Sequence, residues 1–298
     1  MLEAQWSRGN FVCVGLDSDL KRVPDSIKIH EQDSSDEPDW HINVTKTLRS
    51  FNRAIVGATK DLVCAYKPNA AFYEAHGAEG IAALQRTIAD IHVIAPDVPV
   101  ILDAKRADIG NTNASSVKFA FDYLGADAIT VHPYLGAEAM RPFLARAEKG
   151  IIVLCRTSNP GADEFQDLLV QIRSDDYPNG TYIPFYQVVA LSVAMRWNAN
   201  KNCALVVGAT YPDELREVRG LVGDMPILIP GIGAQGGDVE KTVSAGKDSR
   251  GQGIIVNSSS GIIFASKGAD FAEAARRETE KLHDLINQYR LTSPNPSM

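Results

Sequence analysis

The chain has 298 residues, of which 45% are hydrophobic and 22% are charged, a composition typical of a globular protein with a sizeable core. Its formal net charge of −7 argues against nucleic acid and anionic membrane surfaces as partners, but it leaves room for a local cationic site that binds a small anion. Residues 1–10 contain no apolar signal core, and no apolar run is long enough to span a bilayer. We therefore expect a cytoplasmic protein.

The cysteines do not form a motif. Cys13, Cys64, Cys155 and Cys203 each lie within an apolar run, and no CxxC spacing occurs. We expect them to be reduced and buried and to behave as small hydrophobic residues, as in a cytosolic protein. We expect no metal site built from them.

Short apolar runs alternate along the whole chain with segments of helical spacing, and each run is typical of a strand buried on both faces. The predicted strands are 11–17, 62–68, 100–102, 128–133, 150–158, 204–208, 226–230 and 254–257. Leu48, Phe51 and Ile55 predict one apolar helix face after the first strand. A last helix is predicted over 270–289, with Phe271, Ala275, Leu282 and Leu285 facing inward.

Eight strands alternating with helices predict an α/β fold, a (β/α)8 TIM barrel formed by residues 1–291 as one domain, with a disordered tail at 292–298. An open doubly wound sheet is the alternative. The barrel is favoured because polar groups cluster at the carboxyl end of nearly every strand, where a barrel carries its catalytic residues. Two connections are long: 18–40 is predicted to be a solvated loop, and 159–184 has the length of a lid or binding loop.

Charged residues end three of the predicted strands. The stretch 99–112, PVILDAKRADIGNT, places Asp103 and Lys105 two residues apart, so that both side chains point to the same face of a strand, and Asp108 follows in a loop. Asp17 and Lys67 end the first and second strands. Each charge alone is compatible with a structural ion pair, but five of them at one mouth of a barrel indicate a functional site. Carboxylates around Lys105 favour its charged form, so it is a better proton donor than amine nucleophile.

Two glycine-rich loops follow the last two strands. The first is 230–237, PGIGAQGG, and the second is 257–261, NSSSG. Loops at these positions of a barrel commonly hold phosphate through backbone N–H groups, although each loop alone is equally a tight turn. The polar run 157–159, TSN, suits a heterocycle or a sugar, or else caps a turn. His132 is expected to be a core histidine, because no partner stands at ligand spacing.

These motifs together resemble the orotidine 5′-monophosphate decarboxylase family over nearly the whole chain. Residues 103–112, DAKRADIGNT, resemble its DxKxxDIGNT motif, and Lys67, the 157–161 segment TSNPG and the 230–235 segment PGIGAQ also match. The TSNPG segment and the long first loop resemble the branch of the family with larger subunits. Members are homodimeric barrels that convert orotidine monophosphate to uridine monophosphate (UMP) and CO2 without a metal or cofactor.

The resemblance implies a role for each matching residue. Lys105 protonates C6 of the pyrimidine as CO2 leaves, Asp103 lies beside the substrate carboxylate, and Lys67 holds Asp103 and touches the ribose. Asp17 binds ribose hydroxyls and Ser158 the pyrimidine edge, while Asp108 and Thr112 reach into the site of the partner subunit. The residues expected around phosphate are Pro230, Gly231, Gly233, Gln235, Ser259 and Ser260.

One residue departs from the family pattern. Ser260 stands where the family carries an arginine that contacts phosphate, and Arg250 precedes the last strand and so belongs at the other end of a barrel. We expect Ser260 to weaken substrate binding while the proton donor stays intact. Two alternative functions stay open: a metal-dependent decarboxylase or epimerase of a sugar phosphate, and a non-catalytic nucleotide-binding protein. A Schiff-base aldolase is disfavoured by the carboxylates around Lys105.

Overall fold

The computed structural model describes residues 1–32, 40–172, 180–232 and 237–291. The predicted tail at 292–298, together with Gly233 and Gln235, lies outside these residues. The chain forms two compact units. The first unit comprises Met1–Ala104, Lys118–Ile129 and Asn257–Leu285, and the second comprises Lys105–Val117, Thr130–Val256 and Ile286–Met298.

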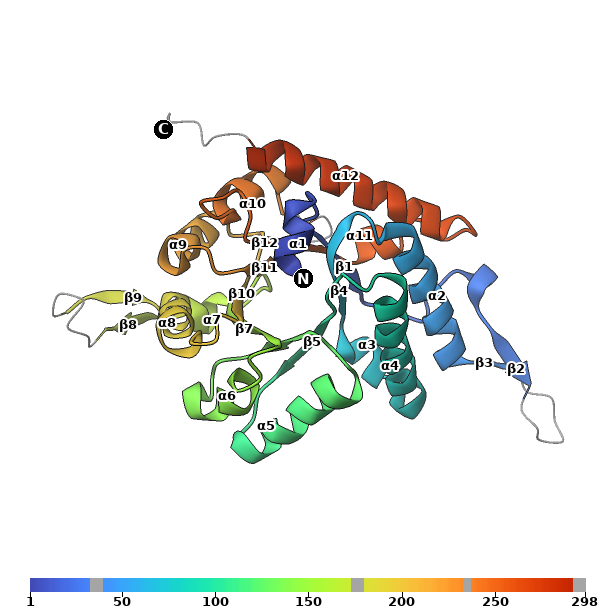
Figure 1. Cartoon of the computed structure of the whole chain (residues 1–298), viewed down its shortest axis with the longest axis horizontal. Helices are drawn as coiled ribbons and strands as arrows, with labels where there is room; N and C mark the ends of the chain where they lie inside the picture. The colour runs from blue at the N-terminus through green and yellow to red at the C-terminus, as the bar shows by residue number, and fades with distance from the viewer. Residues whose placement is uncertain (33–39, 173–179, 233–236, 292–298) are drawn as a thin grey trace. The chain divides into compact units, whose positions relative to one another are not determined.

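The eight predicted strands are all present in one sheet, with ends that differ from the predictions by a few residues. They are β1 (Val12–Leu16), β4 (Val63–Pro68), β5 (Ile101–Arg106), β6 (Ala128–Val131), β7 (Gly150–Arg156), β10 (Cys203–Val207), β11 (Ile227–Ile229) and β12 (Ile254–Ser258). Their order is β4-β1-β12-β11-β10-β7-β6-β5, and Figure 1 labels each of these strands except β6. Isolated parallel bridges Tyr66–Val100 and Asn69–Asp103 connect β4 to β5, the two ends of this order. The closed order and the alternating helices confirm the (β/α)8 barrel class.

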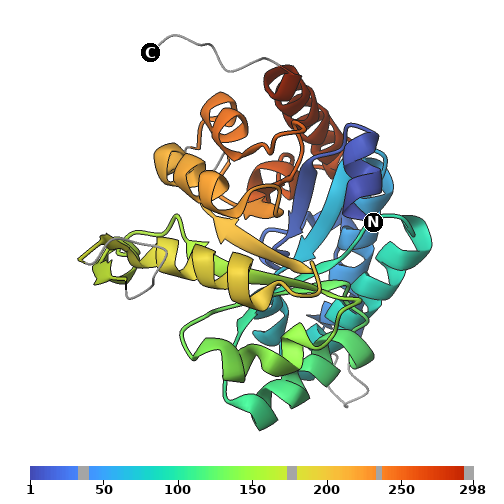
Figure 2. The ribbon, with the colours of Figure 1, turned by 60° about the vertical axis from the view of Figure 1, so that its left-hand side comes forward.

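Neighbouring strands are parallel and their side chains are buried. β10 pairs with β7 so that Cys203 faces Ile151 and Leu205 faces Val153, and Figure 2 shows these two strands side by side. Every residue of β1, β4, β6, β10, β11 and β12 is buried. This explains why the strands are continuous apolar runs rather than alternating ones. The four cysteines are all buried and unpaired, as predicted.

Helices separate the strands. They are α1 (Leu2–Ser7), α2 (Val44–Thr59), α3 (Ala70–Glu74), α4 (Gly77–Ile94), α5 (Gly110–Val117), α6 (Gly136–Leu144), α7 (Asp163–Gln166), α8 (Phe185–Ser192), α9 (Pro212–Val222), α10 (Val239–Gly246), α11 (Ser260–Ile263) and α12 (Phe271–Leu291). Short 3-10 or π-helical turns are η1 (Asp25–Ile27), η2 (Lys118–Tyr123) and η3 (Val193–Trp197). Within the described parts of the chain, no helix combines the length and apolar character that crossing a bilayer requires.

The first unit is packed around α2. The Asn43 side chain caps this helix by accepting a hydrogen bond from the Lys46 N–H, and Leu48, Phe51 and Ile55 are fully buried as predicted. The Phe51 ring stacks on Phe264 and Phe271 at centroid distances of 5.5 and 5.3 Å. Each such ring pair contributes roughly 0.5–1.5 kcal/mol beyond its area burial, so α2 is firmly held.

Three predictions about local structure were wrong. In α12, Leu285 is 39% exposed and Ile286 is buried instead, because the buried stripe runs through Ala275, Thr279, Leu282 and Ile286 and leaves Leu285 at its edge. The 18–40 connection is not a simple loop, since β2 (His30–Gln32) pairs antiparallel with β3 (Trp40–Ile42). His132 is half-buried beside an apolar pocket rather than a core residue.

The long 159–184 connection also has structure of its own. It contains α7 and an antiparallel pair of strands, β8 (Leu169–Gln171) and β9 (Tyr182–Pro184), with Leu169 opposite Pro184. Leu169 and Tyr182 are exposed on this pair. Exposed apolar side chains on a pair of strands are a candidate contact surface for another chain.

Candidate active site

In the first unit, two predicted site residues form a buried ion pair with a third nearby. The Lys67 Nζ lies 2.9 Å from Asp103 Oδ2 and 3.9 Å from Asp17 Oδ1. The side chains of Lys67 and Asp103 are 5% and 10% exposed, whereas that of Asp17 is 23% exposed. The prediction that β1, β4 and β5 bring these charges together is confirmed.

Electrostatics keep this lysine charged. Burial alone would lower the pKa of Lys67, but the Asp103 and Asp17 carboxylates outweigh it and hold the pKa above its usual range. Lys67 is therefore a fixed cation rather than a base. A cation that is buried away from water and held in place before a ligand binds can stabilise the charge that develops in a transition state.

The segment that carries Asp17 is fixed by a buried polar network. Tyr73 Oη donates to the Leu16 carbonyl at 3.0 Å, Asn52 Nδ2 donates to Tyr73 Oη at 2.9 Å, and Ser18 Oγ donates to Asn52 Oδ1 at 2.6 Å. In the described structure, the buried Asp17 Oδ1 accepts no hydrogen bond. A buried carboxylate oxygen with spare acceptor capacity suits a ligand hydroxyl.

The serine loop after β12 lies against β1 within the same unit. A side chain at Gly15 would collide with Ser259 Oγ and come within 3.3 Å of Asn257 Oδ1, so only glycine fits at this point of β1. Ser259 occupies the N-cap position of α11, and Ser260 is its first residue. The two predicted phosphate serines therefore follow a strand end, as expected from the sequence.

Lys105 belongs to the second unit and has an unusual backbone. Its φ is +46°, in the left-handed region that non-glycine residues rarely adopt. Its N–H donates to the hydroxyl of the buried Thr130 at 3.0 Å. Strained backbone at a candidate catalytic residue is a common feature of active sites, because the surrounding structure holds the side chain in one direction.

The loop after Lys105 is pinned by Asn113. The Asp108 N–H donates to Asn113 Oδ1 at 2.9 Å, and Asn113 Nδ2 donates to the carbonyls of Asp108 and Ala139 at 2.6 Å each. Asn113 is fully buried, while Asp108 and Thr112 are exposed. Asp108 and Thr112 were predicted from the sequence, whereas Asn113, whose amide holds the backbone of Asp108, was not.

The remaining predicted residues follow β7 and β11 in the second unit. Ser158 is half-buried, and a side chain at Gly208 would lie 2.6 Å from its Cβ. Pro230 accepts a hydrogen bond from the Ala209 N–H at 2.8 Å. Gly231 has a φ of +102°, and its carbonyl accepts a hydrogen bond from the Gly237 N–H at 3.1 Å. Gly231 therefore has a backbone conformation that residues with a side chain rarely adopt.

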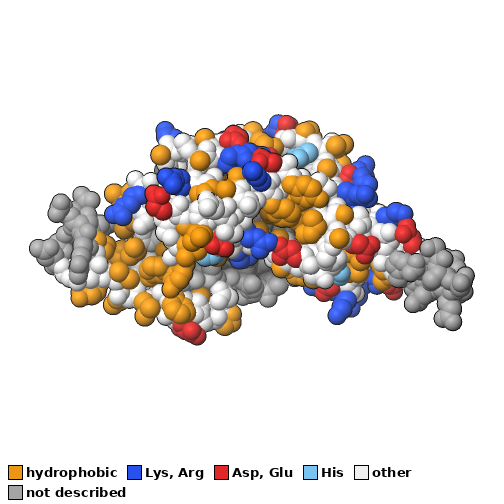
Figure 3. Space-filling model, turned by 90° about the horizontal axis from the view of Figure 1, so that it is seen from below, with side chains coloured by type: hydrophobic (Ala, Val, Ile, Leu, Met, Phe, Trp, Pro, Cys, Tyr) orange, Lys and Arg blue, Asp and Glu red, His pale blue; other side chains and the backbone are white. Residues whose placement is uncertain are grey.

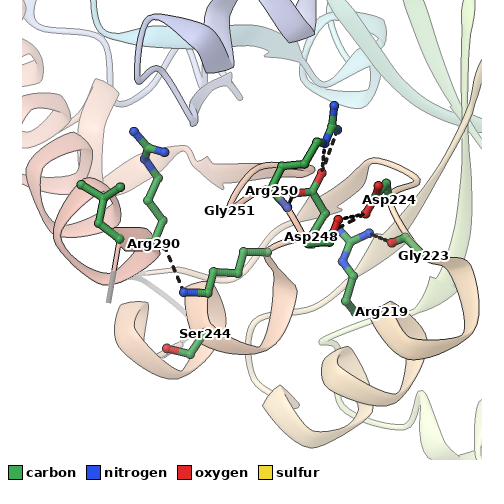
Figure 4. Close-up of a pocket in the computed structure, with 11 residues that line it drawn as sticks. Arg219, Gly223, Asp224, Ser244, Asp248, Arg250, Gly251 and Arg290 are labelled. Carbon is green, nitrogen blue, oxygen red and sulfur yellow. Dashed lines mark hydrogen bonds and ion pairs between the residues drawn. The ribbon is translucent and has the colours of Figure 1, made fainter. Parts of the chain in front are cut away.

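A basic pocket of about 640 Å³ in the second unit lies among connections that precede β11 and β12 (Figure 4). Its cationic side chains already have partners within the protein. Arg219 donates hydrogen bonds to the backbone carbonyls of Gly223, Met225, Gly246 and Gly253, and Lys247 donates to the backbone carbonyls of Tyr289 and Arg290. Arg250 forms an ion pair with Asp248 at 2.8 Å. Arg250, which precedes β12, thus has a carboxylate partner within this pocket. Several of these hydrogen bonds go to carbonyls at helix C-termini and stabilise those helix ends.

The closed strand order and the charged groups at strand ends define the chain as a barrel enzyme. Its relatives give the particular family. The chain belongs to the orotidine 5′-phosphate decarboxylase / HUMPS family, whose model matches residues 10–277.

Individual relatives agree with this assignment. Proteins named orotidine 5′-phosphate decarboxylase from Ralstonia pickettii (strain 12J) and Cellvibrio japonicus (strain Ueda107) are 48% and 46% identical over 290 residues, with 97% of this chain and 97% of each relative covered. The solved structure of Leishmania donovani OMP decarboxylase is similar with a TM-score of 0.77 and 32% identity over 98% of both chains.

Proposed function

We propose that the chain decarboxylates orotidine 5′-monophosphate (OMP) to UMP and CO2, the last step of de novo pyrimidine nucleotide synthesis, as a carboxy-lyase that needs no cofactor. The observation that carries the proposal is the buried Lys67–Asp103 ion pair, which lies on two strands of a chain that bears the 103–112 motif. The names of the relatives support the same activity.

The reaction requires a cation and an acid at one carbon. The bond between C6 and the carboxylate breaks, CO2 leaves, and the electron pair stays at C6. In our proposal the Lys105 ammonium stabilises this charge and donates the proton that completes UMP. Lys105 is exposed to solvent, so water can return the proton to its amine after each turnover.

In our proposal the buried Lys67–Asp103 pair contacts the substrate carboxylate and the ribose, while Lys105 acts at C6. Asp103 is proposed to lie beside the substrate carboxylate, and Lys67 to hold Asp103 and contact the ribose. Asp17 is proposed to accept hydrogen bonds from ribose hydroxyls, a role supported by its buried Oδ1 with no hydrogen bond in the described structure. Charges fixed in advance need little reorganisation during the reaction.

Groups distant from C6 would supply binding energy. Ser158 is proposed to bind the pyrimidine edge. Phosphate is proposed to bind at Pro230, Gly231, Gly233, Gln235, Ser259 and Ser260, of which Gly233 and Gln235 lie outside the described residues. Binding energy from such remote groups can be used to orient and strain the reacting part of a substrate.

We also propose that residues 1–291 work as one domain within a cytoplasmic homodimer whose sites are shared. A pocket of about 590 Å³ in the second unit is lined mostly by apolar side chains, and Tyr134, Phe165 and Leu168 beside it are exposed. Figure 3 shows apolar side chains gathered on the side of the molecule that carries β8 and β9. A second copy that covers this surface would remove it from water.

Shared sites have a direct test. Asp108 and Thr112 are exposed, as residues that reach a partner's site must be before assembly. Lys105→Ala and Asp108→Ala are each expected to be inactive. If the two variants are mixed and subunits exchange, one hybrid site contains both native residues and activity returns in part. No recovery after verified exchange would contradict the shared site.

The activity itself is tested by mixing the protein with OMP in EDTA and following the loss of its ultraviolet absorbance, with UMP and CO2 identified as products. Turnover in EDTA is the expected result. Activity that EDTA abolishes would instead favour the metal-dependent sugar-phosphate enzyme. A protein that binds UMP without consuming OMP would favour the non-catalytic nucleotide-binding protein.

A further inference from the structure

Arg156, at the carboxyl end of β7, is a charged side chain that is only 1% exposed. Its guanidinium forms an ion pair with Asp167, with an Nη2–Oδ2 distance of 3.0 Å, and its Nη1 donates to the Thr157 carbonyl at 2.9 Å. The guanidinium carbon also lies 4.0 Å from the ring centroid of Tyr211. Burying a charge is costly, so it persists only where several partners compensate it. These partners belong to the loops that follow β7 and β10.

Gln166 fixes the residue that precedes Ser158. Its Oε1 accepts from the Thr157 N–H at 2.8 Å, and its Nε2 donates to Thr157 Oγ1 at 2.9 Å. On the other side of Ser158, Asn159 Oδ1 accepts from the Thr157 hydroxyl at 2.6 Å. Both sequence neighbours of Ser158 are therefore held by side-chain hydrogen bonds.

Gly208 lies directly against the backbone of Ser158. Its N–H donates to the Arg156 carbonyl at 2.8 Å. A Cβ built at Gly208 would lie 2.6 Å from Ser158 Cβ and 2.9 Å from Ser158 N, distances that real Cβ atoms do not reach. The loop after β10 thus presses directly on the backbone of Ser158, and only glycine allows this approach.

From this arrangement we infer that Arg156, Gln166 and Gly208 are positioning residues that aim Ser158 at the pyrimidine edge of the nucleotide. The inference rests on the proposed function and adds a specificity element to it. None of the three needs to touch the ligand. Their effect is to remove the conformational freedom of Ser158 before binding, so that its hydroxyl need not be ordered when the pyrimidine arrives.

Two ligands separate this role from a general structural one. UMP has both a pyrimidine and a phosphorylated ribose, whereas ribose 5-phosphate lacks the pyrimidine. Calorimetric dissociation constants for both are measured with the full-length wild type, Ser158→Ala, Gln166→Ala and Gly208→Ala. Gly220→Ala is the matched control, because a Cβ there meets nothing within 4 Å. Thermal unfolding of each variant verifies that it is folded.

We expect Gln166→Ala to weaken UMP binding about 10-fold, the effect of one ordinary hydrogen bond. Gly208→Ala is expected to weaken UMP binding at least as much, while Gly220→Ala leaves it unchanged. Ribose 5-phosphate should bind all variants within about twofold of wild type, the usual error of such comparisons. Adding Gln166→Ala to Ser158→Ala should cause no further loss, because the group being positioned is already absent.

Two results would overturn the inference while leaving the proposed function intact. One is an equal loss of affinity for UMP and ribose 5-phosphate, which indicates a general disturbance. The other is a full additional loss in the Ser158→Ala/Gln166→Ala double variant, which indicates that Gln166 acts independently of Ser158. Wild-type protein that binds no UMP would overturn the proposed function and the inference together.

Discussion

The Lys67 ammonium lies 2.9 Å from the Asp103 carboxylate, and both residues are less than 10% exposed. They come from β4 and β5, which isolated bridges join at the two ends of the strand order. Taking two charges out of water is expensive, so such a pair contributes little net stability, whereas removing one partner alone leaves a buried, uncompensated charge and is severely destabilising. Its retention is better explained by chemistry than by folding.

Replacing Lys67 with methionine leaves Asp103 buried without its cation. We expect Lys67→Met to lose OMP turnover and to lower the free energy of unfolding in urea by about 3–5 kcal/mol. The matched control is Lys281→Met, whose pair with Glu278 is exposed and contributes at most about 1 kcal/mol. Equal destabilisation by the two substitutions would contradict the importance of burial.

The same pair allows stability and activity to be separated. A Lys67→Met/Asp103→Leu double variant removes both charges, so we expect it to regain much of the stability lost in Lys67→Met. It should stay inactive, since the proposed charge array is gone. A double variant that decarboxylates OMP would show that the pair is only structural.

The strained backbone of Lys105 depends on Thr130. Thr130→Val removes the hydroxyl that accepts from the Lys105 N–H at 3.0 Å, whereas Thr130→Ser keeps an acceptor. We expect the valine variant to lower kcat about 10-fold, the equivalent of one buried hydrogen bond, with KM little changed. The serine variant should retain most of kcat. Equal losses in both would point to packing of the methyl group instead.

Restoring an arginine at Ser260 tests the departure from the family pattern. A charge-assisted hydrogen bond to phosphate contributes about 1.5–3 kcal/mol, so Ser260→Arg should raise kcat/KM by about 10- to 150-fold. The gain should disappear with an OMP analogue that lacks phosphate. If Ser260→Arg brings no gain with OMP, phosphate is held by other groups.

Asp90 of α4 binds Arg49 and Arg53 of α2, and we expect the free energy of unfolding to depend on its ionisation at acid pH. Hydrogen bonds from Arg49, together with the charges of Arg49 and Arg53, hold the pKa of Asp90 below its usual 3.8. Because the folded pKa is lowered, the stabilisation is present above about pH 4 and is lost as the pH falls through the folded pKa. Asp90→Asn should therefore lower unfolding free energy at neutral pH, and the difference from wild type should shrink below about pH 4.

The control for this pH dependence is Asp213→Asn. The Asp213 carboxylate pairs with Arg216 but is 84% exposed, so water screens the pair. Its unfolding curves should follow those of wild type at every pH. A difference between Asp90→Asn and wild type that is the same at pH 3 and pH 7 would exclude the ionisation of Asp90 as its cause.

The strands and the charged strand ends could be predicted because each depends on a local pattern. A buried parallel strand is a continuous apolar run, and Asp17, Lys67 and Asp103 stand out where such runs stop. Asn113, Thr130 and Gln166 could not be predicted, since each acts through hydrogen bonds that exist only after folding. Leu285 was assigned to the buried face because it follows Leu282 by three residues, but the buried stripe continues to Ile286 and leaves Leu285 at its edge.

Arg156 did leave a signal in the sequence. It is a charged residue near the end of a predicted buried strand, the same pattern that identified Lys67. Its partner Asp167 lies 11 residues away, in a connection for which the sequence predicts only the length of a lid or binding loop. Gly208 left only the weak signal of a glycine after a strand. The close approach to Ser158 becomes visible only when two loops are seen together.

The most direct test of the central claim compares wild type with Lys105→Ala on OMP in EDTA, with ultraviolet absorbance and UMP formation as the readouts. We predict rapid turnover by wild type. We also predict a loss of at least about 100-fold in kcat for Lys105→Ala, the low end of the contribution of a positioned acid. UMP binding by Lys105→Ala should persist and show that the site is formed. A wild type that leaves OMP intact, or a Lys105→Ala variant that turns it over at the wild-type rate, would contradict the account.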